Sequence, residues 1–176
     1  MLNGADTLWA AIAGIFLLAG LVKGIVGMGL PTVAMGLLAL AMPPAEAAAL
    51  LLVPSFVTNV WQLFAGPSLL DLSKRLWTMM IGIIIGTISG AGLLTSSHAT
   101  TAQFALGVAL IVYATLGLFA VRFAVSSKLE IWLSPLVGLM TGLITGATGV
   151  FVVPAVPYLQ ALQLEREELI QGLGLS

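Results

Sequence analysis

The chain has 176 residues, of which 60% are hydrophobic and 7% charged, with a net charge of −1 and a mean hydropathy of +1.14. A soluble domain carries roughly 25% charged residues, so this composition excludes a soluble enzyme, a nucleic-acid-binding protein and a disordered chain. Cysteine is absent, which excludes disulfides and thiolate metal sites. Lipid is therefore the expected surrounding of most of the chain.

The first apolar segment covers residues 7–42 and is interrupted by Lys23 and several glycines. The residues before it contain no Lys or Arg, unlike a secretory signal, so we expect this segment to be retained. As one helix it would be about 54 Å long, far more than the roughly 30 Å of a bilayer core. The segment is therefore predicted to form two crossings or a broken re-entrant pair.

Four further apolar segments follow, at about 47–65, 76–94, 101–121 and 131–162. The first three each fit one crossing, whereas the last is again too long for a single helix. Proline, glycine and serine separate the segments, as at Pro43-Pro44, because these residues interrupt helices. The sequence predicts an all-α polytopic membrane protein with Gly-broken helices.

Basic residues lie in two of the predicted loops, 66–75 and 121–130, whereas the loops at 43–46 and 95–100 have none. The basic residues are Lys74, Arg75, Arg122 and Lys128. Short cytoplasmic loops carry an excess of Lys and Arg, so we expect loops 66–75 and 121–130 to be cytoplasmic. If the first segment forms a hairpin, the N-terminus lies outside.

An internal repeat relates the two over-long segments. Gly20 and Gly24 match Gly138 and Gly142 at an offset of 118. The first repeat is predicted at about 7–121 and an incomplete second repeat at about 131–176. Because an odd number of crossings separates their starts, the second repeat enters from the opposite side, as in the inverted-topology repeats of secondary transporters. In such folds Gly-interrupted segments indicate the substrate site.

A second interpretation of these glycines is helix packing. Gly-x-x-x-Gly is frequent in membrane helices because small residues allow close backbone approach. We expect Gly82, Gly86 and Gly90 to serve this purpose, and both interpretations stay open for the two matching clusters.

The segment at 47–65 carries a polar face. Ser55, Thr58, Asn59 and Gln62 stand at i, i+3, i+4 and i+7, which is one side of a helix. Polar side chains within a membrane turn inward. They either line a solute path or form interhelical hydrogen bonds worth about 0.6 kcal/mol each. Gln62, near the segment end, is a candidate for the membrane interface.

Lys23 is the one charge inside the first segment. A lysine at the bilayer centre costs at least about 2.5–3.5 kcal/mol, and a charge retained there would suit an anion. Alternatively Lys23 lies near the cytoplasmic surface and extends its ammonium group to water.

The glycine-rich breaks offer a second way to bind an anion. A helix that restarts after Gly27-Met-Gly29, with Pro31 in its first turn, presents backbone N–H groups and a positive dipole end. Thr145 and Thr148 would add hydroxyl donors from the second cluster. The predicted substrate-binding residues are Lys23, Gly27, Gly29, Ser55, Thr58, Asn59, Thr145 and Thr148.

Catalysis and metal binding are poorly supported. His98 is the sole histidine and has no acidic residue near it in sequence, and metal sites need several ligands. Glu165, Glu167 and Glu168 are expected to form a solvated helix start. We predict no enzymatic activity, no catalytic or metal-binding residues and no cofactor.

The stretch from Ala19 to Gln62 contains a Val-Lys-Gly-x-x-Gly-x-Gly run, a Pro-Pro turn and a Pro-Ser-x-x-Thr-Asn run. It resembles the first repeat of the sulfite exporter TauE/SafE family, and residues 138–154 resemble the second. The resemblance implies a multi-pass protein of the bacterial inner membrane that moves small sulfur-containing anions such as sulfite or sulfonates. Members of the family are usually longer. Here the second repeat stops at Ser176, where its copy of segment 47–65 should start.

Two functions follow as expectations. The first is a secondary transporter of small anions whose partners are its solute and the lipid bilayer. The second is a non-transporting membrane subunit, or a truncated remnant that needs a partner chain. A homo-oligomer would then complete the fold.

Overall fold

The computed structural model describes residues 4–27, 29–95, 99–118, 124–151 and 153–176. These residues form eight helices and no strand. The helices are α1 (Gly4–Val26), α2 (Leu30–Leu38), α3 (Pro44–Ala65), α4 (Leu69–Thr95), α5 (Ala99–Leu118), α6 (Ser127–Thr148), α7 (Ala155–Ala161) and α8 (Arg166–Leu175). Five of them, α1, α3, α4, α5 and α6, contain apolar stretches long enough to cross a bilayer. The predicted all-α polytopic membrane fold is confirmed.

Both over-long segments break at glycine. Gly27 and Gly29, between α1 and α2, have φ values of 82° and 102°, and Gly149 ends α6 with φ of 74°. Side chains strongly disfavour this left-handed region, which glycine adopts readily. The 9 residues of α2 span only about 14 Å. Each over-long segment is therefore one crossing helix followed by short helical pieces, which confirms the Gly-broken helices.

The predicted loop boundaries 66–75 and 121–130 were too wide. The link between α3 and α4 is only residues 66–68, so Lys74 and Arg75 lie in the first turns of α4. Likewise α6 begins at Ser127 and includes Lys128. Long basic side chains can reach the membrane surface while their backbone continues a helix, so charge alone did not mark the helix ends. Arg122 and His98 lie outside the described residues.

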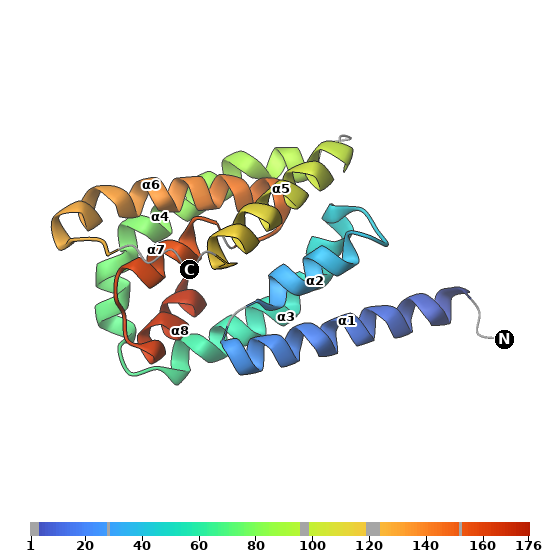
Figure 1. Cartoon of the computed structure of the whole chain (residues 1–176), viewed down its shortest axis with the longest axis horizontal. Helices are drawn as coiled ribbons and strands as arrows, with labels where there is room; N and C mark the ends of the chain where they lie inside the picture. Colours follow the sequence, from blue (N-terminus) through green and yellow to red (C-terminus); the bar gives the residue numbers. More distant parts are fainter. Residues whose placement is uncertain (1–3, 28, 96–98, 119–123, 152) are drawn as a thin grey trace.

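Helices α4 and α6 pack side by side along one flank of the molecule (Figure 1). A Cβ on Gly82 would lie 2.6 Å from the carbonyl oxygen of Pro135, and a Cβ on Gly90 would lie 2.5 Å from that of Leu143. Since the contacts advance along both helices together, the two helices are parallel. The packing role expected of the α4 glycines is confirmed.

The α6 face of this contact consists of the glycines of the second predicted cluster, Gly138, Gly142 and Gly146. A Cβ at Gly146 would lie 2.5 Å from the Thr87 carbonyl oxygen. Their counterparts in the first repeat behave differently, because Gly20 and Gly24 have no such neighbour within 4 Å. The same spacing thus serves close packing in α6 and faces open space in α1.

The path of the chain shows that α1 and α6 run in opposite directions. Lys23, near the end of α1, bonds to Thr58 in the later part of α3. Helix α3 leads through residues 66–68 into α4, and Arg75 near the start of α4 pairs with Glu130 near the start of α6. Helices α1 and α6 therefore run in opposite directions (Figure 1), which supports the inverted topology predicted from the repeats.

Helix α8 is fixed to the end of α3 by Gln171, whose side chain is fully buried. Its Nε2 donates to the carbonyl oxygens of Leu63 (2.7 Å) and Gly66 (2.9 Å), and its Oε1 accepts from Ser68 N (3.0 Å). These are backbone groups that a helix end leaves without intrahelical partners. The acidic stretch before Gln171 begins α8 with a capping box formed by Glu165 and Glu168, which confirms the predicted helix start.

Candidate functional site

Lys23 turns its side chain toward α3 and is only 8% exposed. Its Nζ donates to Thr58 Oγ1 at 2.9 Å and to Asn59 Oδ1 at 2.7 Å. Both partners are neutral, and no carboxylate in the described part of the chain forms an ion pair with Lys23. The side chain therefore does not extend to the surface, and its positive charge is held in place without being neutralised.

Thr58 is oriented by the backbone of its own helix. Its hydroxyl lies 2.9 Å from the Pro54 carbonyl oxygen and 3.1 Å from that of Ser55. Because its single proton points to these carbonyls, Thr58 Oγ1 presents a lone pair to Lys23. Ser55 itself has a buried Oγ with no partner among the described residues, and it does not line the cavity described below.

Gln62, one turn further along α3, bridges to the glycine break. Its Nε2 donates to the Gly27 carbonyl oxygen at 2.6 Å. On the other side, a Cβ at Gly27 would lie 2.9 Å from Ile170 Cγ1 of α8. The predicted polar face of α3 therefore points at α1 and its break, and Gln62 belongs to this cluster.

A small cavity of about 60 Å³ lies beside these residues. It is lined by Lys23, Gly27, Gly29, Pro31, Thr32, Asn59, Gln62, Tyr113, Phe151, Val156 and Leu173. Since one water takes up about 30 Å³ of the liquid, this space is that of about two waters, so it suits only a solute of a few non-hydrogen atoms. The polar wall comes from the first repeat, and the residues after α6 contribute an apolar wall.

A wider groove of about 800 Å³ lies between α1 and α3. It contains the open faces of Gly20 and Gly24 and the exposed aromatic rings of Phe56 and Trp61. Lys23, Gly27 and Gln62 line both the groove and the small cavity. Lys23 therefore borders both spaces.

The two threonines predicted from the second glycine cluster are not brought to the cavity. Thr145 Oγ1 donates to the Thr141 carbonyl oxygen (2.8 Å), and Thr148 Oγ1 donates to that of Ile144 (2.6 Å). Their hydroxyl protons are thus used in hydrogen bonds within the last turns of α6. Thr141, which matches Lys23 at the repeat offset, is fully buried, and its hydroxyl has no partner among the described residues.

Thr32 and Tyr113 also line the cavity, although neither was among the residues predicted from the sequence. Thr32 follows Pro31 in the first turn of α2, so the predicted helix restart could have indicated it. Tyr113 lies in α5, and nothing in the sequence sets it apart.

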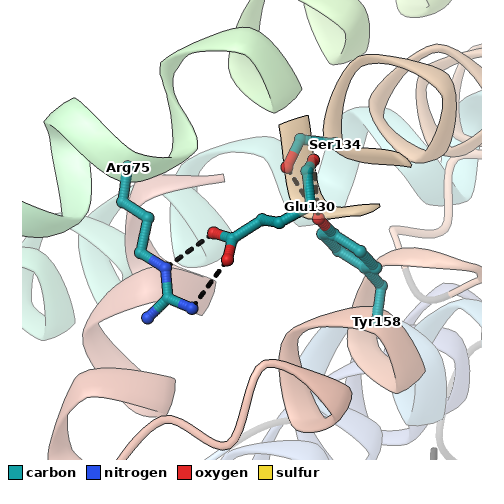
Figure 2. Close-up of polar contacts among 4 residues, drawn as sticks. All are labelled: Arg75, Glu130, Ser134 and Tyr158. Atoms are coloured by element: carbon teal, nitrogen blue, oxygen red, sulfur yellow. Dashed lines mark hydrogen bonds and ion pairs between the residues drawn. The ribbon is translucent and has the colours of Figure 1, made fainter. Parts of the chain in front are cut away.

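A second polar cluster lies outside the cavity lining, where α4, α6 and α7 meet (Figure 2). Arg75 Nε and Nη2 donate to the two carboxylate oxygens of Glu130 at 2.6 and 2.8 Å. Tyr158 of α7 shares a 2.6 Å hydrogen bond with Ser134 of α6. The cluster therefore holds the starts of α4 and α6 together and ties the short helix α7 to α6.

A family model described as sulfite exporter TauE/SafE matches residues 12–171, nearly the whole chain. No curated protein and no solved structure matched the chain. The matched span includes all four polar residues of the Lys23 cluster, namely Lys23, Thr58, Asn59 and Gln62.

Proposed function

The chain belongs to the sulfite exporter TauE/SafE family, and from this premise we propose that it is a secondary transporter of small sulfur-containing anions, such as sulfite or simple sulfonates, in the bacterial inner membrane. One observation carries the proposal: Lys23 is buried beside a cavity and bonded only to neutral groups. Keeping such a charge buried lowers the stability of a multi-pass membrane protein.

That cost is at least about 2.5–3.5 kcal/mol for a lysine at the bilayer centre. A carboxylate partner would reduce it, but the acceptors of the Lys23 ammonium are a hydroxyl and an amide. A bound anion would supply the missing charge. The site is thus suited to an anion that binds and leaves, since no resident carboxylate competes with it.

The position of the cavity supports alternating access. Its polar lining comes from α1, α2 and α3, and its apolar lining includes Val156 of α7 and Leu173 of α8. Secondary transporters commonly bind solute between inverted repeats at broken helices. Movement of the α1–α3 group, together with the α8 helix that Gln171 fixes to α3, against α7 would open the site first to one side and then to the other. We place the starts of α4 and α6 on the cytoplasmic side.

The alternative function, a subunit that transports only with a partner chain, is favoured by the groove between α1 and α3. Gly20 and Gly24 have open space there, whereas the matching glycines of α6 are packed against α4. A helix from another chain could occupy that space. Transport by the purified chain alone separates the two functions.

The test is anion flux into proteoliposomes containing the purified chain, with sulfite, methanesulfonate and chloride as solutes. We expect saturable flux of the two sulfur anions and at least a tenfold loss in Lys23→Met. Lys74→Met is the matched control, because Lys74 is exposed and its replacement should leave flux unchanged. Undiminished flux in Lys23→Met would overturn the role of Lys23. A folded wild-type chain without flux would favour the partner-dependent alternative.

A further inference from the structure

The orientation of one amide suggests how the site discriminates between anions. Resting on the proposed function, we propose that Asn59 is the specificity-determining residue. The ammonium group of Lys23 orients the side-chain amide of Asn59 so that the N–H edge of this amide faces the cavity. The site thereby prefers oxyanions whose oxygens carry no proton. Lys23 then acts in two ways, through its charge and as the positioning residue of Asn59.

The orientation follows from the chemistry of the ammonium group. An ammonium donates hydrogen bonds and accepts none, so the Asn59 atom 2.7 Å from Lys23 Nζ must be the amide oxygen. The amide nitrogen lies on the other edge of the same planar group. It donates to no described residue, and Asn59 lines the cavity. Two N–H groups are therefore available to a molecule in the cavity.

The neighbouring amide is held the opposite way round. Gln62 Nε2 donates to the Gly27 carbonyl oxygen, so the edge that Gln62 leaves open is its amide oxygen, which is an acceptor. Thr32 also lines the cavity, and a threonine hydroxyl can both donate and accept a hydrogen bond. The N–H donors that Lys23 and Asn59 leave available are thus the third ammonium hydrogen and the N–H groups of the Asn59 amide.

This arrangement distinguishes two anions of equal charge and similar size. Methanesulfonate presents three acceptor oxygens and no O–H group, so each oxygen can receive a hydrogen bond from this wall. Dihydrogen phosphate carries two O–H groups, which need acceptors and would oppose N–H groups if turned toward Asn59. Leaving a buried donor without an acceptor is unfavourable. We therefore expect a preference of at least tenfold for methanesulfonate over dihydrogen phosphate in initial flux.

The decisive variant is Asn59→Asp, which keeps the shape of the side chain and replaces the N–H edge by a second acceptor. The matched control is Gln160→Glu, the same chemical change at an exposed position of α7. Flux of both anions is measured in proteoliposomes at one pH where phosphate is mainly the dihydrogen form. Asn59→Asp should shift the flux ratio toward phosphate by about tenfold, and Gln160→Glu should leave the ratio unchanged.

Asn59→Ala provides a second readout if the carboxylate prevents folding, because it removes the N–H groups without adding charge. Its flux ratio should also move toward phosphate. A change that lowers both fluxes equally, with the ratio preserved in both variants, would make Asn59 merely structural and overturn the inference while leaving anion transport intact. Absence of flux for both anions in the wild type would overturn the proposed function and this inference with it.

Discussion

The side chain of Gln62 donates a 2.6 Å hydrogen bond to the backbone carbonyl oxygen of Gly27. This bond joins the polar face of α3 to the point where α1 stops. Gly27 has a left-handed backbone and begins the link to α2, so its carbonyl belongs to a helix end that lacks intrahelical partners. Gln62 thus provides a hydrogen-bond partner for the carbonyl group at the broken end of α1, beside the cavity.

Replacing Gln62 by leucine should affect both stability and transport. Interhelical hydrogen bonds in membranes contribute about 0.6 kcal/mol on average and at most about 1.7 kcal/mol, so a loss of that size is expected in the free energy of unfolding. Anion flux should fall further, at least fivefold, because the break lines the cavity. Thermal unfolding in detergent and flux in proteoliposomes measure the two effects.

Gln103→Leu is the matched control for this experiment. Gln103 Nε2 donates to the Ala39 carbonyl oxygen at 2.9 Å, the same kind of bond, but Gln103 does not line the cavity. The control should lose a similar amount of stability and keep its flux. Equal flux in both variants would show that the Gln62 bond serves folding alone.

The contact between α4 and α6 leads to a prediction about stability. A side chain at Gly86 would meet the backbone of α6, including Leu143 N at 2.8 Å, and backbone cannot move aside as a flexible side chain can. Overpacking of this kind costs about 1–3 kcal/mol or more. Gly86→Leu should therefore lower the unfolding temperature strongly, whereas Gly92→Leu, on the same helix with nothing within 4 Å, should not. Similar melting of the two variants would contradict the packed interface.

The sequence was sufficient to predict where the helices break and which face of α3 is polar. Excess length required a break in residues 7–42, and glycine was the residue able to adopt the backbone found at Gly27 and Gly29. The i, i+3, i+4 spacing placed Thr58 and Asn59 on one side of a helix, and both bond to Lys23. These predictions depend on local geometry, which a single sequence contains.

The features that were missed depend on partners far away in the chain. The spacing of Gly138 and Gly142 is typical of a binding cluster and also of a packing face. Their close contact with the backbone of α4 shows that they form a packing face. Thr145 and Thr148 were expected to donate to an anion, but carbonyls of their own helix lie within reach, as is common for threonine in helices. The partner of Glu130 is separated from it by 55 residues, so charge alone could not identify the pair.

The Arg75–Glu130 pair should stabilise the fold measurably. Glu130 is 9% exposed and accepts two hydrogen bonds from the guanidinium group, and leaving such a group without its partner costs about 1–3 kcal/mol. Arg75→Met should destabilise the protein by that amount. In a double-mutant cycle with Glu130→Gln, the two losses should be less than additive, with a coupling of about 0.5–3 kcal/mol. Lys128→Met, which removes an exposed charge of α6, should have little effect. If the two losses in unfolding free energy are additive, the interaction between Arg75 and Glu130 does not stabilise the protein.

The parallel arrangement of α4 and α6 leads to a prediction of topology. Arg75 and Glu130 are in contact, so the start of each helix lies at the same end of the molecule, and α5 must return between them. The absence of cysteine makes single introduced cysteines easy to follow. Lys74→Cys and Ser126→Cys should react with a membrane-impermeant maleimide only when the cytoplasmic side is exposed, because basic residues gather at that end. Thr100→Cys, in the first turn of α5, should react only from the other side.

Labelling of Lys74→Cys and Thr100→Cys from one side would contradict a crossing by α4. Labelling of all three positions from the sides opposite to those expected would keep the fold and invert its orientation in the membrane.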